Sequence, residues 1–136
     1  MIFHDLLQKM VQHEASDMFV TAKLAVSAKI NGELVAIDDK ILTSAEALGL
    51  VHNAMSEKQQ REFDEDKECN FAISIDGIGR FRVSAFWQRD MAGMVIRRIV
   101  TEIPEADDLG LPSVLKDVVM SKRGLVLFVG GTGTGK

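Results

Sequence analysis

Cysteine is almost absent from this sequence. Cys69 is the only one among 136 residues, so no internal disulfide can form, and a reducing compartment suits the chain. The three histidines, His4, His13 and His52, do not have the spacing of metal ligands, and we predict no metal site. No apolar run approaches the length of a membrane span, and the first residues lack the basic and apolar regions of a signal peptide. We therefore expect a cytosolic protein.

Positive charge is in deficit as well. The chain has 16 lysines and arginines against 20 aspartates and glutamates, and this net charge of −4 argues against a general nucleic-acid-binding surface. Internal repeats and low-complexity tracts are also absent. What is present, 46% hydrophobic and 26% charged residues, is typical of a globular protein of about one domain.

Local patterns at the start of the chain predict a helix and then three strands. Apolar residues spaced by three and four predict an amphipathic helix over residues 2–14. A short β-prone segment follows at residues 18–21. Asn31 and Gly32 separate two alternating segments within residues 26–37, which predicts a hairpin with a two-residue turn, because both residues tolerate positive φ.

Two helix starts follow in close succession. Thr43 and Glu46 have the spacing of a capping box, in which each side chain satisfies a backbone N–H of the first turn. Ser56 and Gln59 repeat the signal, so we expect two consecutive helices. The acidic run at residues 64–66 is interpreted as a solvated face.

Three further strands complete the first domain. Alternation predicts strands at residues 71–75, 80–87 and 94–100, with a turn at residues 76–77 and a tight connection at residues 91–93. The order helix, three strands, two helices, three strands predicts an α+β domain with a mainly antiparallel sheet backed by helices.

The rest of the chain changes character. Residues 101–122 hold both prolines and an acidic stretch, and they are interpreted as a linker with one short helix after Pro112. Residues 124–129 are a continuous apolar segment, which predicts a strand buried in a parallel sheet. We expect an N-terminal domain over residues 1–100, the linker over 101–122 and the start of a second domain over 123–136.

The last residues carry a phosphate-binding pattern. In a G-x-x-x-x-G-K loop, backbone N–H groups surround a phosphate and the lysine reaches the β- and γ-oxygens. The Ser or Thr that binds magnesium in such loops would follow Lys136. We therefore expect the front part of a longer NTPase, inactive by itself. The candidate nucleotide-binding residues are Gly130, Gly131, Thr132, Gly133, Thr134, Gly135 and Lys136.

Three runs of sequence resemble a known family. ASDMF, GIGRFRVSAFWQRDMAGMVIRRI and KRGLVLFVGGTGTGK together resemble the hexameric type IV pilus retraction ATPases, the PilT/PilU group of the secretion ATPases. The GTGTGK loop looks more like the PilU branch. The resemblance implies a PAS-like domain over residues 1–100 and the first part of a RecA-like ATPase domain. It also implies ATP and Mg²⁺ as cofactors of the full-length protein, although we do not expect this chain alone to bind them.

The resemblance further implies that arginines of the N-terminal strands approach the phosphates bound by a neighbouring subunit. Arg82 and Arg97 match these positions, with Arg80 and Arg98 as weaker neighbours and Arg123 as a further contact. A guanidinium beside a transferring phosphoryl group can be worth ~10³ to 10⁵ in rate. From the residues alone, the alternative is that arginines alternating along a strand form its solvent face.

Asp17 lies in ASDMF, which resembles an A-S-D-L-H-L motif of the family. Because Phe19 stands at the histidine position, no role of that histidine can be transferred. The residues alone favour Asp17 as a turn or cap side chain.

The resemblance implies ATP-driven pilus retraction by a homo-hexamer. The implied partners are a second PilT-like ATPase and the inner-membrane pilus platform, with the protein at the cytoplasmic side of that membrane. Two alternatives stay open: a PAS-like regulatory or interaction module, and a related ATPase of type II secretion or pilus extension.

Overall fold

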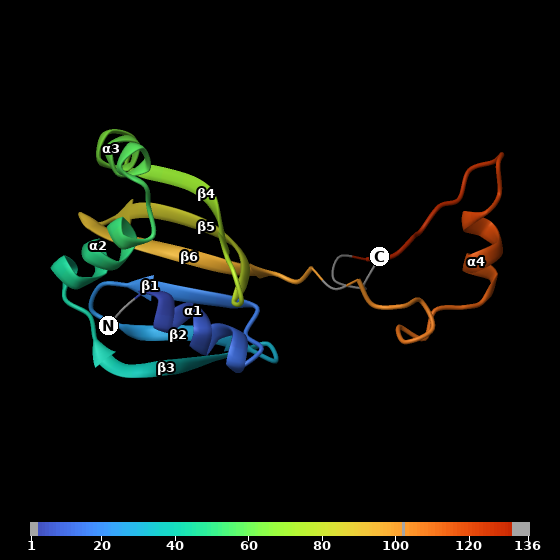
Figure 1. Cartoon of the computed structure of the whole chain (residues 1–136), viewed down its shortest axis with the longest axis horizontal. Helices are drawn as coiled ribbons and strands as arrows, with labels where there is room; N and C mark the ends of the chain where they lie inside the picture. Colours follow the sequence, from blue (N-terminus) through green and yellow to red (C-terminus); the bar gives the residue numbers. More distant parts are fainter. Residues whose placement is uncertain (1–2, 102, 132–136) are drawn as a thin grey trace. The chain divides into compact units, whose positions relative to one another are not determined.

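The computed structural model describes residues 3–101 and 103–131. The chain divides into two compact units, residues 1–101 and 102–136, and Figure 1 shows the six-stranded sheet in the first of them. In chain order the elements are α1 (Phe3–Gln12), β1 (Asp17–Thr21), β2 (Ala25–Ile30), β3 (Glu33–Ile41), α2 (Ser44–Asn53), α3 (Glu57–Asp66), β4 (Glu68–Ile75), β5 (Gly79–Gln88), β6 (Met91–Ile99) and α4 (Val114–Val119).

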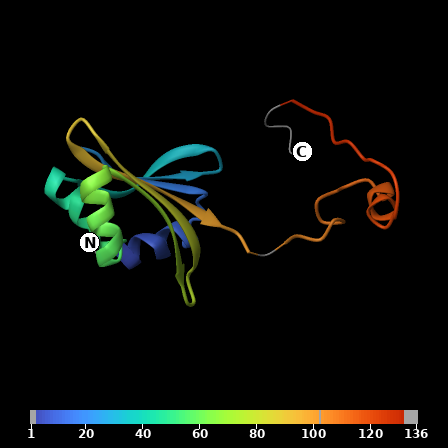
Figure 2. The same cartoon turned by 90° about the horizontal axis from the view of Figure 1, so that it is seen from above.

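The six strands form one sheet in the order β3-β2-β1-β6-β5-β4, and every neighbouring pair is antiparallel. The first strand of the chain therefore lies in the middle of the sheet, between β2 and β6. Helices α1, α2 and α3 lie on the same side of this sheet (Figure 2). The predicted fold class, α+β with an antiparallel sheet backed by helices, is confirmed.

The two faces of the sheet differ in chemistry. The helix-covered face carries fully buried apolar side chains, among them Met18, Val83 and Ile96, which pack with the apolar face of α1. Because successive side chains of a strand point to opposite faces, the residues between them in sequence lie on the other face. We call this second side, which none of the described helices of the first unit covers, the open face.

Local sequence signals are confirmed at three places. Asn31 has φ 50° and Gly32 has φ 88°, as the predicted turn between β2 and β3 requires. Thr43 accepts a hydrogen bond from the backbone N–H of Glu46, whose carboxylate accepts one from the backbone N–H of Thr43 in return. A second capping box of the same kind opens α3.

The predicted connection at residues 91–93 is wrong. The turn between β5 and β6 is made by Arg89 and Asp90, which adopt φ 52° and 58°, and Met91 already pairs with Gln88 in the ladder. Gly93 lies within β6, at a position where the strands approach closely and a side chain would not fit. A Cβ atom on it would come 3.1 Å from the carbonyl oxygen of Val20. That glycine was therefore a packing signal and not a turn signal.

In the second unit, α4 (Val114–Val119) lies where a short helix was predicted after Pro112. The predicted strand over residues 124–129 is not formed in this structure. A strand exists only where a neighbour satisfies its backbone groups, and none of the six described strands pairs with this segment. Its apolar side chains, such as Phe128, are exposed. None of the described helices is long and apolar enough to cross a membrane.

Candidate functional site

Four charged side chains form one row across the open face. Asp17 of β1 pairs with Lys29 of β2 on one side and with Arg97 of β6 on the other. Arg97 in turn pairs with Arg82 of β5. Directly opposite residues have Cβ atoms roughly 4.5–5.5 Å apart, so the row is continuous. The sheet therefore brings together Arg82 and Arg97, the two arginines singled out from the sequence.

Asp17 is the buried charge of this row. It is only 8% exposed, and both of its carboxylate oxygens accept hydrogen bonds. The Arg97 Nε–H donates to Oδ1 at 2.8 Å, and the Ser16 hydroxyl donates to Oδ2 at 3.0 Å. Burial by itself would raise the pKa of Asp17, but these two hydrogen bonds and the charges of Arg97 and Lys29 outweigh it and lower the pKa. Asp17 is thus held in its charged form.

The two arginines present their guanidinium groups to solvent. The side chain of Arg97 is 70% exposed, although its Nε is bound to a buried carboxylate. The Asp17 carboxylate raises the pKa of Arg97 through the same hydrogen bond and charge. Arg82 is exposed, and within residues 3–101 and 103–131 no carboxylate pairs with it. An exposed pair of arginines with available N–H donors is suited to binding an anion with several oxygens, such as a phosphate.

The three weaker arginine candidates lie in three different places. Arg80 is on β5 two residues before Arg82, so it shares the open face. Arg98 pairs with Phe81, whose side chain is fully buried, and it belongs to the opposite face. Arg123 lies in the second unit, where its carbonyl oxygen accepts a hydrogen bond from the Ser121 hydroxyl. The structure therefore groups Arg80 with the two principal arginines and separates Arg98 from them.

Only the beginning of the predicted phosphate loop lies within the described residues. Gly130 and Gly131 are described, whereas residues 132–136, including Lys136, lie outside the described residues. In the described part of the chain, no group of three or more His, Cys, Asp or Glu side chains is placed to hold a metal ion.

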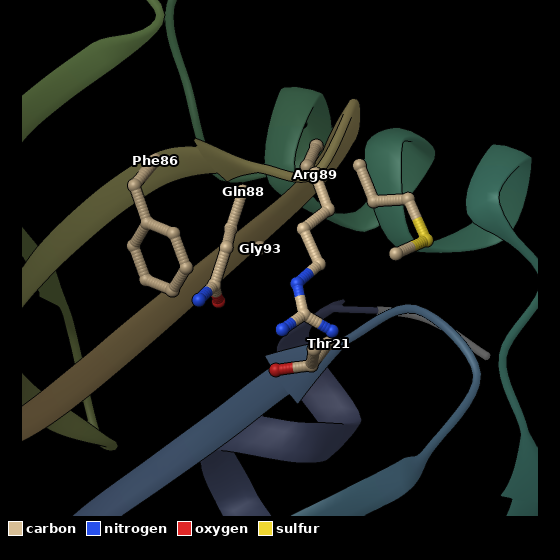
Figure 3. Close-up of a pocket in the computed structure, with 7 residues that line it drawn as sticks. Thr21, Phe86, Gln88, Arg89 and Gly93 are labelled. Carbon is tan, nitrogen blue, oxygen red and sulfur yellow. The ribbon is translucent and has the colours of Figure 1, made fainter.

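A pocket that the sequence did not predict lies at one end of the open face (Figure 3). It has a volume of about 290 Å³, and its lining includes Thr21, Phe86, Gln88, Arg89 and Gly93. In Figure 3 the Arg89 side chain extends from the β5–β6 turn toward Thr21 at the end of β1. Because Gly93 has no side chain, there is room for the ring of Phe86, the residue directly opposite on β5. The pocket could not be predicted from the sequence, because residues from the ends of three separate strands form it.

Comparison with known proteins places these features in a family. No family model matches the chain. The type IV pilus ATPase PilU of Pseudomonas aeruginosa is 51% identical over 136 residues, which is 100% of this chain and 36% of PilU. The type IV pilus retractation ATPase PilT of the same organism is 35% identical over 132 residues, 97% of this chain and 38% of PilT. A crystal structure of the pilus retraction motor PilT with bound ADP superposes with a TM-score of 0.80 at 30% identity, covering 97% of this chain and 39% of that chain.

These matches define an α+β domain of the class found at the N-terminus of pilus retraction ATPases, followed by a short further segment. The chain is homologous over its whole length to the type IV pilus ATPases of the PilT/PilU group, as the sequence motifs indicated. The chain spans only 36% of the length of PilU and 38% of that of PilT.

Proposed function

We propose that this chain is the N-terminal part of a hexameric ATPase that couples ATP hydrolysis to type IV pilus retraction. The observation that carries the proposal is the 51% identity to PilU across all of the chain, a span that includes both the arginine strands and the phosphate-loop pattern. In this proposal residues 1–100 are a PAS-like domain, residues 101–122 a linker and residues 123–136 the start of a RecA-like ATPase domain.

The phosphate groups of ATP are held by the loop of residues 130–136. Its glycines allow backbone N–H groups to approach the phosphates, and the Lys136 ammonium offsets their negative charge. ATP, with Mg²⁺, supplies the phosphoryl group that is transferred to water. The donor set on the open face suits such a polyanion, because Arg82 and Arg97 both carry exposed guanidinium groups.

We propose that Arg82 and Arg97 act on the nucleotide bound by a neighbouring subunit. A guanidinium that meets the transferring phosphoryl group stabilises the charge that develops on it. The alternative, arginines that only solvate the sheet, accounts less well for Arg97, because its Nε is fixed by a buried carboxylate. The proposed partners are the other subunits of the hexamer, a second PilT-like ATPase and the inner-membrane pilus platform, at the cytoplasmic side of that membrane.

The proposal is tested by ATP hydrolysis in the full-length protein that contains this chain. We expect Lys136→Ala and Arg82→Ala each to lower the rate at saturating ATP by at least about 100-fold. Lys122→Ala and Arg61→Ala are matched controls, because both residues are exposed and neither forms an ion pair within the described chain, and they should leave the rate unchanged.

Two outcomes would contradict the proposal. Absence of hydrolysis in the unmodified full-length protein would favour a regulatory or interaction module over a motor. Hydrolysis that is lost in Lys136→Ala but kept in Arg82→Ala would support the proposed ATPase activity and contradict the proposed role of Arg82. We also expect the 136-residue chain alone to show no hydrolysis.

A further inference from the structure

The geometry points to Asp17 as the positioning residue for Arg97. We propose that Asp17 fixes the Arg97 guanidinium through its Nε, so that its two terminal NH₂ groups face outward and meet a phosphate as a pair. This inference rests on the proposed function, because it names the residue that prepares one of the proposed phosphate contacts.

The first argument is which donor of Arg97 is used. A guanidinium has five N–H donors, one on Nε and four on the two terminal nitrogens. Only the Nε–H is bound in the described structure, by Asp17 Oδ1 at 2.8 Å, and the side chain is otherwise 70% exposed. The edge formed by the two terminal nitrogens can bind two oxygens of a phosphate at once. Asp17 thus restrains the side chain without occupying that edge.

The second argument is that Asp17 is itself held firmly. It is 8% exposed and lies on β1 in the middle of the sheet, between β2 and β6. The Ser16 hydroxyl donates to its second oxygen at 3.0 Å, and the backbone N–H of Arg98 donates to the Ser16 carbonyl at 3.0 Å. A carboxylate fixed on both oxygens gives Arg97 a defined direction, which a flexible surface partner would not.

The third argument is electrostatic. Arg97 lies directly opposite Arg82, and like charges in that position repel each other. The Asp17 carboxylate lies on the other side of Arg97 and offsets part of this repulsion. Without that charge, the two guanidinium groups would turn away from each other, and a phosphate would have to order them at the moment of binding. With Asp17 in place, the Arg97 guanidinium is ordered during folding and not at the moment of phosphate binding.

Kinetics of the full-length protein test the inference through Asp17→Asn, Arg97→Ala and the double variant. Asp17→Asn keeps the size of the side chain and removes its charge, and we expect it to lower kcat for ATP hydrolysis by roughly tenfold. Arg97→Ala should lower kcat at least as much. In the Arg97→Ala background, Asp17→Asn should change kcat by less than about twofold, because it acts through Arg97.

Asp38→Asn is the matched control, since Asp38 forms an ion pair with Lys9 at 3.6 Å away from the arginine row. It should leave kcat unchanged. A direct readout without nucleotide is the exchange of the Arg97 Nε–H with water, followed by NMR in the 136-residue chain. We expect slower exchange for Arg97 than for Arg82, and the difference should vanish in Asp17→Asn.

The outcomes separate this inference from the proposed function. If Asp17→Asn lowers kcat by the same factor with and without Arg97, the positioning role is overturned. It is also overturned if the Arg97 Nε–H of the unmodified chain exchanges as fast as the Nε–H of Arg82. In both cases the proposed ATPase activity is unaffected. If Arg97→Ala leaves kcat unchanged while Lys136→Ala abolishes hydrolysis, both the inference and the proposed contact of Arg97 with the phosphate are overturned. If the unmodified full-length protein does not hydrolyse ATP, the proposed function is overturned together with the inference.

Discussion

Phe63 packs helix α3 against the sheet. It is 0% exposed and is the only buried residue of α3, which is otherwise polar. Its ring stacks on Trp87 of β5 with centroids 6.1 Å apart and meets the His52 ring edge-on at 6.2 Å. Truncation of a fully buried phenylalanine costs about 3–5 kcal/mol, because apolar contacts are lost and a cavity is left. We expect Phe63→Ala to lower the free energy of unfolding by that amount, a large share of the stability of a small domain.

Urea unfolding followed by tryptophan fluorescence measures this effect, because Trp87 is the only tryptophan of the chain and lies against the altered ring. Circular dichroism provides a second probe that does not depend on the environment of Trp87. Phe63→Leu should cost much less, and Phe128→Ala, at a side chain that is 66% exposed, should change the free energy by less than about 0.5 kcal/mol. A loss below about 1 kcal/mol for Phe63→Ala would refute the packing of α3 on β5.

Two further predictions concern the close approach in β6 and the first capping box. Gly93→Ala places a Cβ atom 3.1 Å from the Val20 carbonyl oxygen, and the resulting strain of about 1–3 kcal/mol outweighs the gain from a stiffer unfolded chain. Thermal unfolding should show a lower Tm for this variant, and an unchanged or higher Tm would contradict the close approach. The hydrogen bonds of Glu46 with Lys40 and with the backbone and side chain of Thr43 lower its pKa to about 2. A carboxyl group whose pKa is lowered by folding stabilises the folded state at pH values above its unfolded pKa of about 4.3. This contribution is lost as the pH falls toward 2. The difference in stability between the unmodified chain and Glu46→Gln should therefore shrink over that interval, and a constant difference would contradict it.

Features specified by neighbouring residues could be predicted from the sequence. The turn at Asn31 and Gly32 depends on backbone conformations that few residues adopt, so the dipeptide was enough to predict the hairpin. The capping boxes of α2 and α3 depend on residues three positions apart. The alternation over residues 80–87 likewise predicted the strand β5, in which Phe81 and Val83 are buried and Arg82 lies on the other face.

Features that depend on strand order and register could not be predicted. The ion pair between Asp17 and Arg97 joins residues 80 positions apart, and it exists because β1 lies next to β6. The sequence alone favours Asp17 as a turn or cap residue, because no neighbouring residue indicates which distant side chain will form an ion pair with it. Arg98, adjacent to Arg97, is a weaker candidate from the sequence, but the register places it on the opposite face of the sheet.

Two predictions were wrong for different reasons. The β5–β6 turn was misplaced because Arg89 and Asp90 adopt left-handed conformations that are uncommon for residues other than glycine, whereas the more obvious signal, Gly93, serves packing. The apolar segment at residues 124–129 has the composition of a buried strand, but composition does not supply a partner. A parallel strand forms only together with its neighbours.

The most direct test of a phosphate site shared between subunits is ATP hydrolysis by mixed assemblies of two impaired full-length variants, Lys136→Ala and Arg97→Ala, each carrying a different affinity tag. We expect each variant alone to hydrolyse ATP much more slowly than the unmodified protein, and doubly tagged assemblies to regain part of the rate. In some of their sites, an intact loop from one subunit meets an intact arginine from its neighbour. Doubly tagged assemblies that are no faster than either variant alone would contradict the claim that the open face of one subunit completes the phosphate site of another.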